Sequence, residues 1–92
     1  MAVEVRIPTI LRTFTGGEKA VSGTGDTLAQ LIDDVDGRHP GLKDRIVDAT
    51  ALRRFVNVYV NDEDVRFSGG LSSPVADGDV VVVLPAVAGG SR

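Results

Sequence analysis

The sequence predicts an α+β fold, in which one main helix packs across a mixed sheet of four to five strands. Apolar and polar residues alternate over residues 3–7 and again over 55–60, the period-two pattern of half-buried strands. Between these runs, apolar residues follow helical spacing; they are Leu28, Leu31, Ile32 and Val35. Because strands come before and after a single helix, we expect the helix to cover one face of the sheet.

The first strand ends at Pro8, and a second strand is expected to return beside it. Gly16-Gly17 lies between two strand-like runs, which predicts a hairpin that returns through residues 19–21. The helix then begins at Asp26 or Thr27, either of which can cap it, and ends by Pro40. Residues 42–54 are ambiguous between a helical turn and a loop, and we interpret them as a connection under the sheet.

The second half of the chain predicts three more strands. Over residues 55–60, Val56, Val58 and Val60 point one way and the intervening side chains the other. A turn at 61–62, a short strand at 64–67 and a loop at 68–73 follow. Residues 80–84 form a continuous apolar run, which suits a strand in the interior of the sheet with both faces covered. We expect the first and last strands to lie side by side at the centre.

Composition excludes several classes of function. The chain has 92 residues, which suits one domain, and its net charge of −3 comes from scattered charges rather than a basic stripe, so no nucleic-acid partner is expected. There is no cysteine, and the single His39 cannot form a metal site alone. No segment approaches a membrane span or a signal peptide, which favours a soluble, cytoplasmic protein.

No combination of residues predicts an enzyme. The paired acids Asp33-Asp34 and the acidic run at 61–64 are accompanied by no nucleophile or histidine. We interpret them as a solvated helix face and a turn. No metal or cofactor bound by this chain is expected.

Three blocks of sequence carry a family resemblance. They are IPTILR at 7–12, VNVYVNDEDVR at 56–66 and LPAVAGG at 84–90. Together they resemble the bacterial sulfur-carrier proteins of the ThiS/MoaD group, and within it the carrier of the cysteine-forming branch. The resemblance implies a ubiquitin-like β-grasp domain at 1–84 and a flexible C-terminal tail at 85–92, in a carrier that is monomeric when free.

In that family the C-terminal glycine is the working residue, and the matching position is Gly90. The resemblance implies that an ATP-dependent, E1-like enzyme adenylates its carboxylate, which is then converted to a thiocarboxylate. In the cysteine branch the sulfur passes to an aminoacrylate on a pyridoxal-phosphate enzyme, and a JAMM-type zinc metalloprotease removes the new C-terminal cysteine. The ATP and the pyridoxal phosphate are used by these partners, and the carrier is their substrate.

The residues of the tail suit this role. Pro85 lacks an N–H and directs the chain out of the sheet. Residues 85–90 span about 20 Å when extended, at roughly 3.3–3.6 Å per residue. The tail is slim because its side chains are small, with Val87 the only bulky one; the others are Ala86, Ala88, Gly89 and Gly90.

Ser91 and Arg92 depart from the family pattern. While they follow Gly90, its carboxyl carbon is part of an amide and cannot be adenylated. We therefore expect a precursor in which a protease cuts after Gly90 and removes Ser91-Arg92. The alternatives are an engineered addition or a line that has lost the activity.

A docking face is also expected. If Val56, Val58 and Val60 face the helix, the open face of the sheet carries an apolar patch; its members are Phe55, Tyr59, Phe67 and Leu84. Burial of these residues is the alternative. Arginines are expected to flank the patch and to pair with an acidic partner, or else to be simply solvated; they are Arg53, Arg54 and Arg66.

Three other functions share these features. A ubiquitin-like modifier would join Gly90 to lysines of target proteins, and a molybdopterin synthase small subunit would keep its tail in a larger subunit. A β-grasp interaction domain with an inert tail would show no ATP-dependent change at Gly90.

Overall fold

A computed structural model describes residues 2–49, 51–54 and 56–85 of the chain. It contains a five-stranded mixed sheet in the order β2-β1-β7-β5-β6. The strands are β1 (Val3–Arg6), β2 (Ala20–Gly23), β5 (Val56–Val60), β6 (Glu63–Asp64) and β7 (Val80–Pro85). The first and last strands, β1 and β7, lie parallel at the centre, and the other pairs are antiparallel, as predicted for the fold class.

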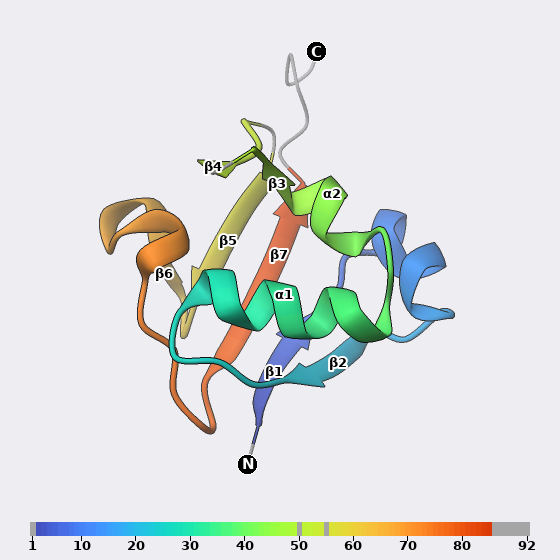
Figure 1. The fold of residues 1–92 in the computed structure, drawn as a ribbon, viewed down its shortest axis with the longest axis horizontal. Helices are drawn as coiled ribbons and strands as arrows, with labels where there is room; N and C mark the ends of the chain where they lie inside the picture. The colour runs from blue at the N-terminus through green and yellow to red at the C-terminus, as the bar shows by residue number, and fades with distance from the viewer. Residues whose placement is uncertain (1, 50, 55, 86–92) are drawn as a thin grey trace.

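The main helix, α1 (Leu28–Arg38), crosses one face of the sheet (Figure 1). Thr27 caps it, because its Oγ1 accepts from the backbone N–H of Gln30 (3.3 Å). The Gln30 side chain in turn accepts from the backbone N–H of Asp26 (2.8 Å). Of the two capping candidates Thr27 is therefore the cap, and Asp26 contributes its backbone N–H; the predicted apolar face of α1 is buried.

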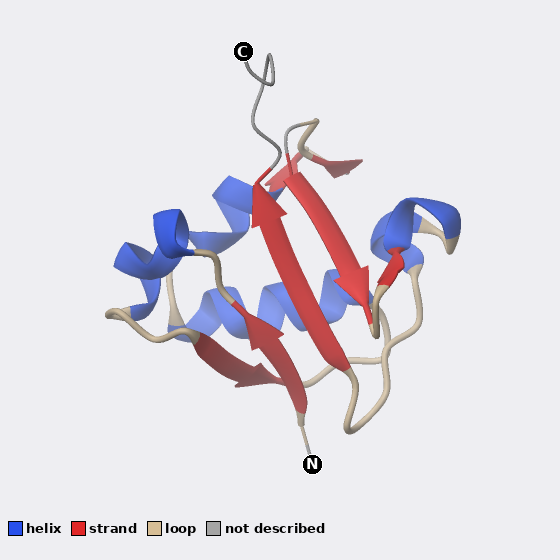
Figure 2. Ribbon diagram, turned by 180° about the vertical axis from the view of Figure 1, so that it is seen from behind, coloured by secondary structure: helices blue, strands red, loops and turns tan. Residues whose placement is uncertain are grey.

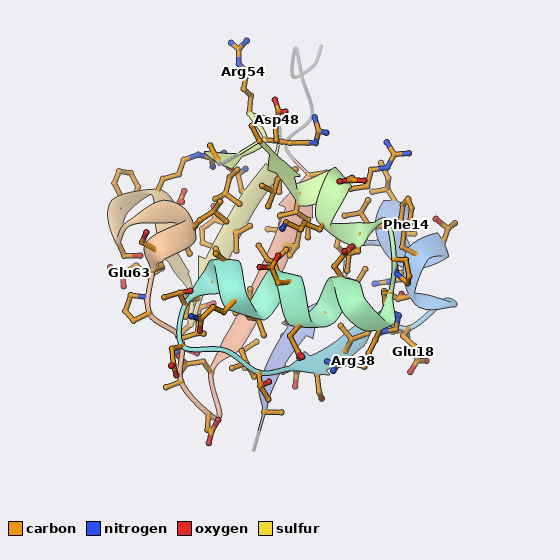
Figure 3. All side chains as sticks on the ribbon, viewed as in Figure 1. Phe14, Glu18, Arg38, Asp48, Arg54 and Glu63 are labelled. Atoms are coloured by element: carbon orange, nitrogen blue, oxygen red, sulfur yellow. The ribbon has the colours of Figure 1, made fainter. Side chains whose placement is uncertain are left out.

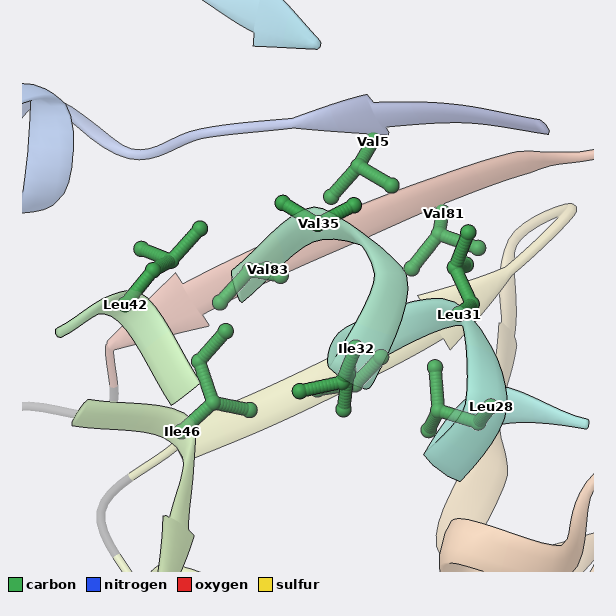
Figure 4. A pocket seen from close by; sticks show the side chains of 10 residues that line it. Val5, Leu28, Leu31, Ile32, Val35, Leu42, Ile46, Val81 and Val83 are labelled. Carbon is green, nitrogen blue, oxygen red and sulfur yellow. The ribbon is translucent and has the colours of Figure 1, made fainter. Parts of the chain in front are cut away.

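The core lies between α1 and the sheet. A void of about 10 Å³ remains there, too small to hold a water molecule comfortably, and its lining is apolar (Figure 4). Leu28, Leu31 and Val58 are at most 1% exposed. This interior is therefore tightly packed.

The connection between β1 and β2 differs from the predicted tight hairpin. The two strands pair as expected, but a 3-10 helix, η1 (Thr9–Thr15), stands between them. Gly16 ends η1 in the left-handed conformation at φ 65°, and the buried Thr15 hydroxyl bonds both the Arg12 and the Glu18 carbonyl oxygens (3.2 and 2.9 Å). The glycine pair therefore terminates a helix.

Residues 42–54 form more structure than the predicted connection. The short helix α2 (Leu42–Ile46) is followed by a two-stranded sheet of β3 (Val47–Asp48) and β4 (Ala51–Leu52). Asp36, near the end of α1, accepts from the backbone N–H groups of Gly41 (3.1 Å) and Lys43 (3.0 Å). The start of α2 is thus held by a side chain from the preceding helix.

The predicted strand at 64–67 is wrong beyond its first residue. Asp64 ends β6, and its side chain accepts from the backbone N–H of Arg66 (2.9 Å), which turns the chain into the 3-10 helix η2 (Val65–Phe67). A further 3-10 helix, η3 (Gly70–Ser72), occupies the predicted loop.

The valine run of β7 also differs from its prediction. The strand is interior to the sheet, but α1 covers only one of its faces, as Figure 2 shows from the other side. Val81 and Val83 are buried, whereas Leu84 is 45% exposed.

Candidate functional site

The last described residue of the chain, Pro85, ends the central strand of the sheet. It lies opposite Val56 in the β5–β7 ladder, so the chain remains in strand register up to this point. The tail therefore starts where the central strand of the sheet ends (Figures 1 and 2). Its predicted working residues lie outside the described part of the chain; they are Ala86, Val87, Ala88, Gly89, Gly90, Ser91 and Arg92.

The open face of the sheet carries a row of apolar side chains along β7. Val80, Val82 and Leu84 alternate with the buried valines and so share this face. Tyr59 lies opposite Val82 on β5 and is half-buried. We call Tyr59, Val82 and Leu84 the open-face strip; it runs toward the point where the tail begins.

Polar groups border this strip on both sides. On β1, Arg6 pairs with Glu4 (2.7 Å), and Arg6 lies opposite Val82. On β5, Asn57 lies opposite Leu84 and accepts from Arg66 Nη1 (2.6 Å).

Arg66 is fixed by further hydrogen bonds. Its Nη2 donates to the carbonyl oxygens of Val56 (2.6 Å) and Arg53 (3.2 Å). Arg66 is therefore a cationic border to the strip. The Arg53 side chain instead donates from its Nε to the carbonyl oxygen of Asp44 in α2 (2.6 Å).

The structure separates the residues that were expected to form one patch. Tyr59 and Leu84 share the open face, but Phe67 lies on η2, beyond the short edge strand β6, and is 86% exposed. Phe55 lies outside the described residues. Val82, between Tyr59 and Arg6, was missed, because a run of four valines gives no contrast between the two faces of the strand.

The acidic residues of α1 have structural partners. Asp34 accepts from the backbone N–H of Thr24 and from Arg38, each at 2.9 Å, and these bonds lower the pKa of its carboxyl. Asp33 accepts from Lys43 Nζ (2.5 Å), which raises the pKa of that ammonium group. Arg38, the partner of Asp34, also donates to the Ser22 carbonyl oxygen and so connects α1 to the edge strand β2 (Figure 3).

The described residues offer neither a metal centre nor a membrane span. Over residues 2–49, 51–54 and 56–85, no three side chains of histidine, cysteine, aspartate or glutamate gather as a cation site. No helix in the same ranges has the length and hydropathy to cross a bilayer. What the structure presents is a surface, the open-face strip, beside the start of the tail.

This arrangement of a mixed sheet, a crossing helix and a tail that leaves the central strand is that of the ubiquitin-like β-grasp proteins. The family model described as ThiS matches residues 5–90, and the chain belongs to the ThiS family.

Similar proteins agree with this assignment. The chain is 58% identical over 93 residues to sulfur carrier protein CysO of Mycobacterium tuberculosis, covering 98% of this chain and 100% of the relative. A chain of the Amycolatopsis orientalis BexX/CysO complex is 64% identical with a TM-score of 0.93, covering 96% of this chain and 99% of that one. SAMP1 of Haloferax volcanii is 27% identical with a TM-score of 0.77, covering 97% and 99%.

Proposed function

We propose that this chain is a cytoplasmic sulfur carrier and that its working group is the carboxyl of Gly90. The observation that carries the proposal is the family match, which extends through the tail and ends at residue 90. The high identity to CysO over the full length of that relative supports the cysteine-forming branch as the destination of the sulfur.

Loading proceeds in two steps on an E1-like partner. A carboxylate oxygen of Gly90 attacks the α-phosphorus of ATP and displaces pyrophosphate, which gives an acyl adenylate. A hydrosulfide-equivalent sulfur from the partner then attacks the carbonyl carbon, and AMP leaves with the electrons of the C–O bond. The product is a thiocarboxylate. Adenylation is needed because AMP is a good leaving group, whereas the oxide of a free carboxylate is a poor one.

The chain's own contribution is to present this carboxyl. Residues 86–90 reach at most about 18 Å beyond Pro85, at roughly 3.6 Å per residue. The sheet fixes the origin of the tail, because β7 pairs with β1 as far as Val82 and with β5 as far as Pro85. A partner that binds the open-face strip therefore holds the tail within reach of its own catalytic pocket.

Removal of Ser91-Arg92 must come first, because the carboxyl carbon of Gly90 is an amide carbon in the longer chain. A protease, in our proposal the JAMM-type metalloprotease of the pathway, cuts the Gly90–Ser91 bond. A pyridoxal-phosphate enzyme then accepts the sulfur. In all these steps the partner enzymes act on this chain as their substrate.

The test is the intact mass of the chain after incubation with lysate of its host, ATP and sulfide. Expected are loss of the Ser-Arg dipeptide and then the mass change of one oxygen replaced by sulfur. A second sample, ending at Gly90, separates loading from trimming, and omission of ATP is its control. If the chain ending at Gly90 gains no sulfur in the presence of ATP, sulfur carriage is refuted.

Conjugation to proteins is the competing function, and the similarity to SAMP1, a small archaeal modifier protein, is the observation that favours it. The two functions share the acyl adenylate, and they differ in the nucleophile that resolves it. Isopeptide-linked conjugates of Gly90 with lysines in the same lysate, without a thiocarboxylate, would replace sulfur carriage by conjugation.

A further inference from the structure

A groove opens at the end of β7, on the side of the sheet away from the open-face strip. One wall is η1, and the other is formed by α2, β3 and the segment after β4. Its lining includes the apolar side chains of Ile10, Leu11, Phe14, Val56, Val83 and Pro85. Ile10 is 67% exposed, although it is large and apolar. Such an exposed residue beside an apolar groove is typical of a surface that binds another protein.

Arginines also line this groove; they are Arg45, Arg53 and Arg54. The guanidinium of Arg45 lies over the ring of Phe14, 5.4 Å from its centroid, and so connects α2 to η1. Arg53 is held by two bonds, from its Nε to the Asp44 carbonyl (2.6 Å) and from its backbone N–H to the Ile46 carbonyl (2.9 Å). Arg45 and Arg53 are thereby positioned before any partner arrives.

Arg45 and Arg53 take part in no ion pair among the described residues. The three ion pairs in the described part of the chain join Arg6 to Glu4, Arg38 to Asp34 and Lys43 to Asp33. Asp48 is the one acidic residue among those that line the groove (Figure 3). The whole chain is nevertheless acidic, with a net charge of −3. The groove is a local cationic surface on an acidic protein.

We propose that this groove docks an acidic segment with apolar anchors, supplied by the protein that receives the tail. The proposal rests on the proposed function, in which another protein draws Gly90 into its active site. Val83 and Pro85 line the groove and belong to the strand from which the tail leaves. A protein that binds the tail is therefore brought against the groove.

The geometry of β7 gives this contact a specific consequence. Val83 faces the groove side and Leu84 the open face, because successive residues of a strand point to opposite sides. A partner that occupies both surfaces clamps the end of β7 and fixes the direction in which the tail leaves. The acidic segment contributes attraction and orientation, and the apolar anchors contribute contact area.

A binding experiment with the full chain tests this proposal without any chemistry at Gly90. The probe is a fluorescein-labelled synthetic peptide with leucines at helical spacing and glutamates at the positions between them. The control peptide has glutamine in place of each glutamate. We expect the glutamate peptide to bind more tightly and to lose affinity as salt is raised. Amide resonances of Phe14 and Asp48 should shift in an NMR titration, with those of the open-face strip unchanged.

Charge reversal gives the sharper readout. Arg45→Glu and Arg53→Glu should each weaken binding of the glutamate peptide by about five-fold, the upper range for a single exposed charge pair. Lys19→Glu makes the same change of charge at an exposed position before β2, and should leave binding unchanged. Circular dichroism verifies that all three variants are folded, and the salt dependence of the unaltered chain tests the same idea without a variant.

The outcomes separate this proposal from the proposed function. Equal binding of the two peptides, or equal losses in all three variants, would overturn the acidic docking groove. A chain that acquires sulfur at Gly90 but binds neither peptide at the groove would also overturn it, with sulfur carriage intact. A chain that binds the glutamate peptide through Arg45 and Arg53 but never acquires sulfur supports the groove and refutes sulfur carriage.

Discussion

Tyr59 and Val82 lie directly opposite each other in the antiparallel β5–β7 ladder, on the face of the sheet that α1 does not cover. Leu84 follows on the same strand and the same face, one residue before the end of β7. An apolar strip thus leads to the start of the tail. A partner that binds the strip gains contact area and positions the tail through the same interaction.

Leu84→Glu tests the strip. The side chain is 45% exposed, so we expect the melting temperature to change little. A charge within this apolar contact should slow adenylation of Gly90 at a subsaturating concentration of the partner by roughly ten-fold or more, the size of a hot-spot effect. The measurement is the rate of pyrophosphate release with the chain ending at Gly90.

Ala20→Glu is the matched control for this variant. Ala20 is exposed on the edge strand β2, so the new carboxylate lies two strands away from β7, and Arg6 on the intervening strand β1 is its neighbour. We expect the adenylation rate to stay unchanged. Equal losses in the two variants would show that net charge, and not the strip, governs the encounter.

The main elements of the fold could be predicted because their signals are local. Val3 and Val5 alternate with charged residues, and Leu28 to Val35 repeat at helical spacing, so each run specifies its own conformation and its buried face. The start of α2 could not be predicted in this way. It depends on the Asp36 side chain, which caps it from the preceding helix.

The candidate site divides in the same manner. The alternation around Tyr59 predicts that its side chain points to the other face of the sheet from the buried Val58, and the structure agrees. Val82 could not be assigned to a face, because its neighbours on both sides are valines and the two faces differ only in what covers them. Phe67 was expected on a strand, but the side-chain bond from Asp64 turns the backbone into η2. Gly90 was identified through the family resemblance and stays a prediction.

Gly41 and Gly37 should respond oppositely to alanine. Gly41 has φ 98°, and a Cβ there would lie 3.0 Å from the Phe14 ring, so Gly41→Ala should destabilise the fold by about 1–3 kcal/mol. Gly37 lies in α1, and a Cβ added to it would have no neighbouring atom within 4 Å, so Gly37→Ala should stabilise by up to about 1 kcal/mol. Urea denaturation measures both. Equal effects of one sign would contradict this account of the α1–α2 loop.

Asp34 should contribute to the acid stability of the fold. The Thr24 N–H and Arg38 lower the pKa of its carboxyl in the folded state. A lowered folded pKa means that the contribution is present above the usual pKa of the group and is lost as the pH falls through the lowered value. Asp34→Asn should therefore reduce stability at neutral pH and reduce the slope of stability against pH on the acid side.

Thermal unfolding between pH 2 and 7 measures this effect, with Asp77→Asn as the control. Asp77 is exposed in the turn before β7. Its substitution makes the same change of charge away from Thr24 and Arg38. Parallel profiles for Asp34→Asn and the unaltered chain would show that Asp34 makes no net contribution.

Asn61 sets the register on which the open-face strip depends. Its Nδ2 donates to Asp79 (2.9 Å) and its Oδ1 accepts from the backbone N–H of Val80 (3.0 Å), so it joins the end of β5 to the start of β7. Its backbone is left-handed at φ 50°. Asn61→Gly keeps this conformation available and removes both side-chain bonds, which should cost about 1–2 kcal/mol. Asn61→Ala removes the same bonds and adds strain of roughly 1 kcal/mol.

The difference between these two variants in urea denaturation separates the hydrogen bonds from the backbone strain. Asp62→Gly is the control, because Asp62 is also left-handed, at φ 72°, and glycine adopts this conformation without strain. We expect it to be neutral or slightly stabilising. If Asn61→Gly were as stable as the unaltered chain, the ladder hydrogen bonds alone would hold β5 against β7, and Tyr59 would stay opposite Val82 without the help of Asn61.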